Sequence, residues 1–104
     1  MPTLWVFGRN SPRSFELGQS EVSIGRAEGN TIRVKDPTIS KKHARLFERG
    51  GAWHVEDLGS VNGTWIHDER IQTAKLAPGT KFRLGKHDFR FDDINIEEDS
   101  IQEI

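Results

Sequence analysis

The chain has no cysteine among its 104 residues. Disulfides, thiolate metal sites and cysteine nucleophiles are therefore all excluded. No apolar run approaches the roughly 20 residues that a helix needs to cross a bilayer. The N-terminus also lacks a basic region followed by an apolar stretch of signal-peptide length. These absences predict a protein of a reducing, cytoplasmic compartment that has no membrane partner.

Negative charge is concentrated at the C-terminal end. Residues 92–104 hold six of the 16 acidic residues and no Lys or Arg, so residues 1–91 hold ten acidic and 15 basic residues, a balance of +5. A mildly cationic body suits an anionic partner, although ordinary surface charge explains the balance equally well. We assign residues 1–92 to one domain and residues 93–104 to an acidic tail, which is either a frayed end or the start of a linker.

No segment keeps the i, i+3, i+4 apolar spacing of an amphipathic helix for more than one turn. Short alternating segments, separated by turn signals about every eight to twelve residues, predict an all-β sandwich or barrel instead. A turn is expected at 10–12, and His67-Asp68 is expected to turn a hairpin. The main candidate strands are residues 4–7, 13–17, 21–24, 31–35, 43–48, 53–57, 81–84 and 87–91.

A polar, basic loop precedes the central strand. Asp36-Pro37 stops the segment before it, because proline fixes its own φ and lacks an N–H. The loop then offers the hydroxyl of Ser40, the cations of Lys41 and Lys42, and the imidazole of His43. Those groups are suited to hold an anion.

Three short motifs together resemble the forkhead-associated (FHA) domain. They are Gly25-Arg26, Ser40-x-x-His43 and Asp57-Leu58-Gly59-Ser60-x-Asn62-Gly63-Thr64. Each motif alone is weak, but all of them in order make a strong pattern, and the resemblance extends over about residues 3–92. It implies a sandwich of two antiparallel sheets, with loops 25–30, 36–42 and 58–63 at one end. These loops would bind a peptide that contains phosphothreonine.

The resemblance also implies roles for single residues. Arg26 would offer a planar fork of donors to two phosphate oxygens. Ser40 would donate its hydroxyl, and its backbone amide as well, while Lys41 would add a mobile positive charge. Asn62 has a donor and an acceptor, so it would bond the peptide backbone on both sides of the phosphorylated residue.

The remaining family positions are structural or peripheral. His43 would fix the Ser40 loop, and Gly25 and Gly63 would permit backbone geometry that a Cβ obstructs. Val61 stands where the family often has a polar residue, which makes that contact with the peptide apolar. Additional contacts are expected from Lys35, Lys42 and Val61, with Arg33 more remote.

Three other functions compete with this one. Ser40, His43 and Asp57 suggest a hydrolytic triad, but there is no Gly-x-Ser-x-Gly elbow and the first two residues are too close in one loop. Trp and Phe among basic residues suggest a barrel for single-stranded nucleic acid. The third alternative is an interaction module that ignores phosphate and uses another face.

The phosphopeptide hypothesis comes with further expectations. We expect a monomer with no catalytic residue, no cofactor, no metal and no nucleic-acid partner. His54, His67 and His87 lack metal-ligand spacing and are expected at the surface or in turns. Trp5, Trp53 and Trp65 are expected in the core or on a sheet face.

Overall fold

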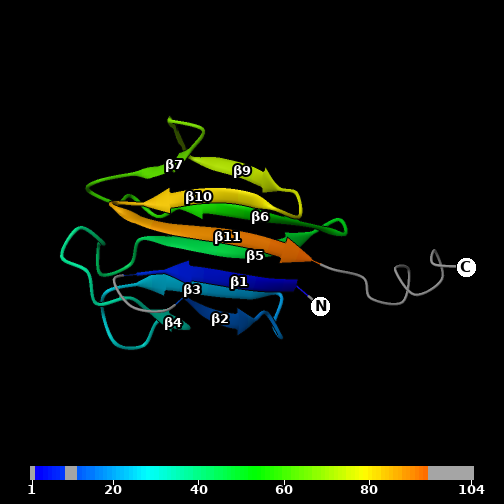
Figure 1. Cartoon of the computed structure of the whole chain (residues 1–104), viewed down its shortest axis with the longest axis horizontal. Coiled ribbons are helices and arrows are strands. Elements are labelled where there is room, and N and C mark those ends of the chain that lie inside the picture. Colours follow the sequence, from blue (N-terminus) through cyan, green and yellow to red (C-terminus); the bar gives the residue numbers. More distant parts are fainter. Residues whose placement is uncertain (1, 9–11, 94–104) are drawn as a thin grey trace, which may run out of the picture.

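The computed structural model describes residues 2–8 and 12–93, and within them the chain forms eleven β-strands and no helix (Figure 1). Accordingly, these residues contain no helix that is long and apolar enough to cross a membrane. The last strand ends at Asp93, one residue beyond the predicted domain boundary. Most of the predicted turn at 10–12 and the rest of the predicted tail, residues 94–104, lie outside the described residues.

The strands form two sheets that face each other (Figure 1). The first sheet contains, in spatial order, β2 (Arg13–Glu16), β1 (Pro2–Phe7), β11 (His87–Asp93), β10 (Thr80–Leu84), β7 (Thr64–Ile66) and β8 (Glu69–Ile71). The second sheet contains β4 (Ile32–Arg33), β3 (Glu21–Gly25), β5 (Ala44–Arg49), β6 (Ala52–Asp57) and β9 (Thr73–Leu76). This arrangement confirms the predicted all-β sandwich.

The core lies between the two sheets and follows from the alternation within each strand, since successive side chains point to opposite faces. Phe89 and Phe91 of β11 point inward, and Phe89 stacks on Phe82 with ring centroids 5.3 Å apart. The ring of Trp53 in the second sheet contacts that of Phe91 in the first, with ring centroids 6.1 Å apart. The other fully buried strand residues include Leu4, Val6, Ile24, Ala44, Leu46, Val55 and Leu84. Of the three tryptophans, Trp53 lies in the core and the other two are half-buried on the outer face.

One predicted strand is shorter than expected. The alternation over residues 31–35 is present, with Ile32 and Val34 buried, but β4 contains only two residues and pairs with β3 in parallel. The Val34 amide still bonds to the carbonyl of Gly25, whereas the Asp36 amide bonds to the carbonyl of Val34 itself. The chain therefore turns away from the sheet after Val34, because its next hydrogen bonds are local.

The pairing register brings the predicted binding loops to one end. Ile24 of β3 lies opposite Ala44 of β5, which lies opposite Asp57 of β6. Because the sheet is antiparallel here, β3 ends, β5 begins and β6 ends at the same edge. The loops 26–31, 34–43 and 58–63 therefore lie together at the left of Figure 1.

The hairpin between β7 and β8 has a common type of turn with uncommon residues in it. Its two central residues, His67 and Asp68, have φ angles of 50° and 65°, and Ile66 pairs with Glu69. Both residues thus occupy the left-handed region of a type I′ turn, which favours Asn-Gly. The hairpin expected at this dipeptide is confirmed, and its residues are strained there, because an L side chain in this region costs roughly 1 kcal/mol or more.

Replacing the turn dipeptide by its preferred sequence should stabilise the fold. We expect His67→Asn with Asp68→Gly to raise the free energy of unfolding by about 1 kcal/mol, measured by urea denaturation. The control His67→Ala with Asp68→Ala should lower it, since alanine gains nothing from this backbone geometry. A double variant with Asn-Gly that is no more stable than the parent protein contradicts this explanation.

Candidate functional site

A buried histidine joins two of the loops. The His43 side chain is fully buried, its Nδ1 accepts a hydrogen bond from the Ser40 amide at 3.1 Å, and its Nε2 lies 2.9 Å from the Gly63 carbonyl oxygen. Since Nδ1 is an acceptor, the ring proton must be on Nε2, which donates to Gly63. The Ser40 amide is thus bound within the protein, contrary to the expectation that it contacts a phosphate.

A buried carboxylate organises the third loop. Asp57 Oδ2 accepts hydrogen bonds from the amides of Gly59 and Ser60, both at 3.0 Å. Its Oδ1 accepts from the hydroxyls of Ser60, at 2.6 Å, and Thr64, at 2.7 Å. Burial raises the pKa of Asp57, but these hydrogen bonds outweigh burial and leave the pKa below its usual value. The carboxylate therefore holds loop 58–63 in its ionised form.

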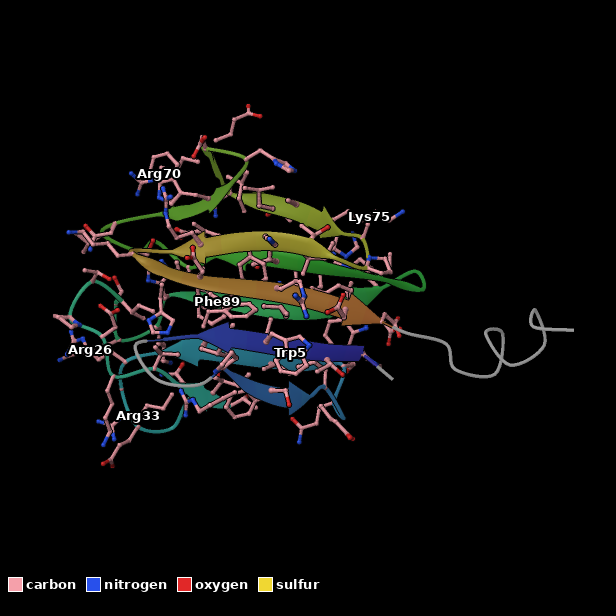
Figure 2. All side chains as sticks on the ribbon, in the orientation of Figure 1. Trp5, Arg26, Arg33, Arg70, Lys75 and Phe89 are labelled. Atoms are coloured by element: carbon pink, nitrogen blue, oxygen red, sulfur yellow. The ribbon has the colours of Figure 1, made fainter. Side chains whose placement is uncertain are left out.

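Arg26 is positioned by the neighbouring loop. Its backbone amide donates to the Ser40 carbonyl, and its Nε donates to the Ile39 carbonyl, both at 3.0 Å. Its two terminal guanidinium nitrogens have no hydrogen-bond partner among the described residues. Figure 2 shows the side chain at the loop end of the molecule. The fork is therefore held in place through Nε, and its outer edge remains available.

The side chains of Ser40 and Asn62 each use only part of their hydrogen-bonding capacity within the protein. Ser40 Oγ accepts a hydrogen bond from the Val61 amide at 3.1 Å, which leaves the hydroxyl proton without a partner in the described part of the chain. Asn62 Nδ2 donates to the Thr38 carbonyl at 2.8 Å, which leaves one N–H and the Oδ1 atom. Val61, whose amide makes this bond to Ser40, is 80% exposed. These remaining polar atoms and the valine side chain face solvent.

The two predicted glycines permit close approaches. A Cβ on Gly25 would overlap the backbone carbonyl of Lys41, which also accepts a hydrogen bond from Asn30 Nδ2 at 2.8 Å. Gly63 has a φ of 88°, and a Cβ there would lie 2.7 Å from Arg70 Nε. Side chains at these positions would displace the loops. Asn30 is a further connecting residue that the sequence did not indicate: its Nδ2 donates to the nearby Ala27 carbonyl and to the Lys41 carbonyl of the next loop.

The predicted lysines are placed differently from one another. Lys41 and Lys42 are exposed in the same loop as Ser40. Lys35 is exposed too, and together with Arg26 it lines an open hollow of about 550 Å³. The main chain of Arg26 is hydrogen-bonded directly to that of Ser40, and the Asn62 side chain is hydrogen-bonded to Thr38 of the same loop as Ser40. These bonds gather Arg26, Ser40 and Asn62 at one end of the molecule.

A second network behind the loops was not predicted. Asp36 Oδ1 accepts from the amide and hydroxyl of Thr38, at 2.8 and 2.7 Å, and Asp36 Oδ2 lies 3.1 Å from His87 Nδ1. Thr38 Oγ1 in turn accepts from the Lys86 amide at 3.1 Å. Because the Thr38 carbonyl holds Asn62, this network positions the Asn62 side chain. Sequence alone did not indicate it, since His87 lies 51 residues from Asp36.

The site has no metal-binding arrangement within the described residues. No group of three or more His, Asp or Glu side chains there is placed to hold an ion. A hydrolytic triad is not assembled either. The Ser40 group that meets His43 is the backbone amide, whereas a nucleophile would need its hydroxyl there, and His43 Nε2 is 4.0 Å from Asp57.

Comparison with known proteins relates this chain to one domain type. The model of the FHA domain family matches residues 22–85. The FHA domain-containing protein FhaB of Mycobacterium tuberculosis (strain ATCC 25618 / H37Rv) is 46% identical over 71 residues, which cover 67% of this chain and 46% of FhaB. The chain spans about half the length of the curated relatives that it matches.

Solved structures extend the likeness to the fold. One comes from a structural and functional analysis of phosphothreonine-dependent FHA domain interactions, with a TM-score of 0.82 and 28% identity over 90% of this chain and 97% of the other. Another is Mycobacterium tuberculosis EmbR in complex with a low-affinity phosphopeptide. Its TM-score is 0.77 and its identity 28%, over 86% of this chain and 24% of EmbR.

The Asp36 network makes stability depend on pH. Burial raises the pKa of Asp36, but hydrogen bonds from His87 and Thr38 lower it to about 2, below the ordinary value of 3.8. Because the folded pKa is the lower one, the ionised carboxyl stabilises the fold. This contribution, on the order of 2 kcal/mol, is complete above about pH 4 and is mostly lost as the pH falls to about 2.

We therefore expect Asp36→Asn to lower the free energy of unfolding at neutral pH and to flatten its decline between pH 4 and pH 2. Urea denaturation at a series of pH values measures both effects. Asp88→Asn, which changes an exposed carboxylate, is the matched control and should keep the slope of the parent protein. An unchanged slope in Asp36→Asn would show that Asp36 is not the titrating group.

Proposed function

Because the chain belongs to the FHA domain family, we propose that residues 1–92 form a non-catalytic module that binds phosphothreonine-containing peptides. The observation that carries this proposal is the convergence of three loops on one end of the sandwich. There the outer edge of the Arg26 guanidinium, the Ser40 hydroxyl proton and half of the Asn62 amide all lack partners among the described residues.

The phosphate is assigned to the first two loops. Arg26 offers two parallel N–H donors, which match two oxygens of a phosphate group. Ser40 donates its hydroxyl to a third oxygen, and the exposed ammonium of Lys41 complements a charge close to −2 at neutral pH. The fixed backbone of both loops supports this assignment, since Arg26 and Ser40 are hydrogen-bonded directly to each other through the main chain.

The peptide backbone is assigned to the third loop. Asn62 retains an acceptor and a donor, which suit the N–H and C=O groups that flank the phosphorylated residue. Val61, which is largely exposed beside it, offers an apolar contact to the peptide. Lys42 is assigned a peripheral contact. In this account His43, Gly25 and Gly63 shape the pocket without touching the ligand.

The biological setting follows from the chemistry. The ligand is the product of a Ser/Thr kinase, and binding would mediate a reversible protein–protein contact in cytoplasmic signalling. The module would act as a monomer, without a cofactor and without nucleic-acid or membrane partners. The relation to a structure of EmbR with a phosphopeptide supports this class of ligand. Residues 93–104 are proposed to lie outside the binding domain.

A surface of the first sheet favours the nucleic-acid alternative. On its outer face the guanidinium of Arg83 lies 5.5 Å from the Trp65 ring, and that of Arg90 lies 5.6 Å from the Trp5 ring. Such pairs occur where single strands stack on proteins. That function would not need Arg26, so one variant separates the two hypotheses.

We expect peptides from a degenerate phosphothreonine library to bind with dissociation constants on the order of micromolar, which corresponds to a binding free energy of about −8 kcal/mol. Arg26→Ala should weaken binding about 100-fold or more, because two hydrogen bonds to a charged group, each worth roughly 1.5 kcal/mol or more, are lost. Fluorescence anisotropy measures this. Arg49→Ala, at the far end of β5, should bind like the parent protein. Equal binding of unphosphorylated peptides or of single-stranded DNA would overturn the proposal.

Phosphate should also be distinguished from carboxylate. A glutamate in place of phosphothreonine carries one charge and two oxygens, so it cannot occupy the Arg26 fork, the Ser40 hydroxyl and Lys41 together. We expect its affinity to fall at least about 100-fold, close to that of the threonine peptide. Competition between the three peptides for one labelled phosphopeptide measures the order. Comparable affinity of the glutamate peptide would contradict the assigned contacts.

A further inference from the structure

A cationic hollow lies beside Arg26 and is not needed to bind one phosphate. It has a volume of about 550 Å³ and is lined by Arg26, Arg33, Lys35 and Pro37. Three of these four residues carry a positive charge, and none of the four carries a carboxylate. Arg26, Ser40 and Lys41 already supply the donors that a single phosphate uses, so Arg33 and Lys35 remain without a role in the proposed contact.

The backbone holds these two cations on the same side. Ile32 and Val34 are buried, whereas Arg33 and Lys35 are both exposed and line the same hollow. The parallel pairing of β3 with β4 places Arg33 opposite Gly25, next to Arg26. Arg33 Nε also donates to the Arg26 carbonyl at 2.9 Å, which fixes its guanidinium next to that loop. Figure 2 shows Arg33 near Arg26, at the end of the molecule opposite Lys75.

The nearby acids do not neutralise the hollow. Glu28 is the one carboxylate recorded near Arg33 in the described part of the chain, and it lies 3.7 Å from Arg33 NH1 with its side chain 87% exposed. An exposed pair at this distance contributes little. Asp36 follows Lys35 in sequence, but its two oxygens are bound to Thr38 and His87. Positive charge therefore accumulates here, and the like charges repel each other unless an anion joins them.

We propose that Arg33 and Lys35 form a second anion subsite, which binds a further negative group on the same phosphothreonine peptide. This inference rests on the proposed function, since the phosphothreonine anchors the peptide at Arg26. The hollow shares Arg26 with the phosphate site, so the second anion lies within about four residues of the phosphothreonine in an extended peptide. A phosphoserine or an acidic residue supplies the same chemistry, with the phosphate carrying more charge.

The ligand preference can be measured with two peptide sets. Both contain one phosphothreonine in an otherwise neutral sequence, and they carry either glutamate or phosphoserine at each of the four positions on either side. We expect one or two adjacent positions to strengthen binding, by about fivefold for glutamate and about tenfold or more for phosphoserine. The gain should shrink as salt is raised, because the subsite is exposed. Isothermal titration calorimetry or anisotropy gives the dissociation constants.

Three variants test which residues are responsible. Arg33→Gln with Lys35→Gln should remove the gain from the second anion, so that peptides with and without that anion bind this variant about equally. Lys75→Gln with Lys81→Gln removes the same charge from exposed positions on other strands and should keep the full gain. Glu28→Gln should enlarge the gain, since it removes the carboxylate that competes for Arg33.

The outcomes separate this inference from the function on which it rests. If the singly phosphorylated peptide binds but no second anion improves its affinity, the subsite is refuted and the phosphothreonine site stands. The subsite is also refuted if the second anion still improves the affinity of the variant Arg33→Gln with Lys35→Gln, or if the control Lys75→Gln with Lys81→Gln loses as much of this gain. If no phosphothreonine peptide binds at all, both proposals fall together.

Discussion

The site depends on one buried imidazole. His43 holds the Ser40 amide on one ring nitrogen and the Gly63 carbonyl on the other, and in this way joins two loops that are 20 residues apart. The ionised Asp57 holds loop 58–63 through four hydrogen bonds. Both groups order the loops in the structure without a ligand. A loop that is already ordered avoids part of the entropy that binding would otherwise cost.

The interior network and the outward groups divide the work between them. The side chains of Arg26, Ser40 and Asn62 each make one hydrogen bond that fixes their position, and each side chain keeps further polar atoms without partners among the described residues. The guanidinium is held through Nε, which leaves its planar pair of terminal nitrogens. This arrangement presents charge complementary to a phosphate dianion on a rigid β scaffold, where geometry limits the choice of ligand.

Local sequence patterns predicted much of this structure. The alternation around Ala44 and Leu46 and the turn at His67-Asp68 were sufficient to place strands and a hairpin. Contacts between distant segments were beyond the sequence. Nothing in the sequence around Asp36 indicated that its side chain would pair with His87. The bond from the Asp36 amide to the Val34 carbonyl, with which the chain leaves the sheet after β4, was not predictable from the alternation either. The motif that contains Asp57 was visible, but its role as the acceptor of four donors appears only in three dimensions.

A crystal structure of the domain with a bound phosphothreonine peptide tests the central claim most directly. We expect the phosphate oxygens to lie about 3 Å from the terminal nitrogens of Arg26 and from Ser40 Oγ. We also expect the His43 contacts to Ser40 and Gly63 to be kept unchanged. A phosphate bound away from Arg26, or loops that rearrange and break the His43 hydrogen bonds, would contradict the claim that the fold holds this site ready.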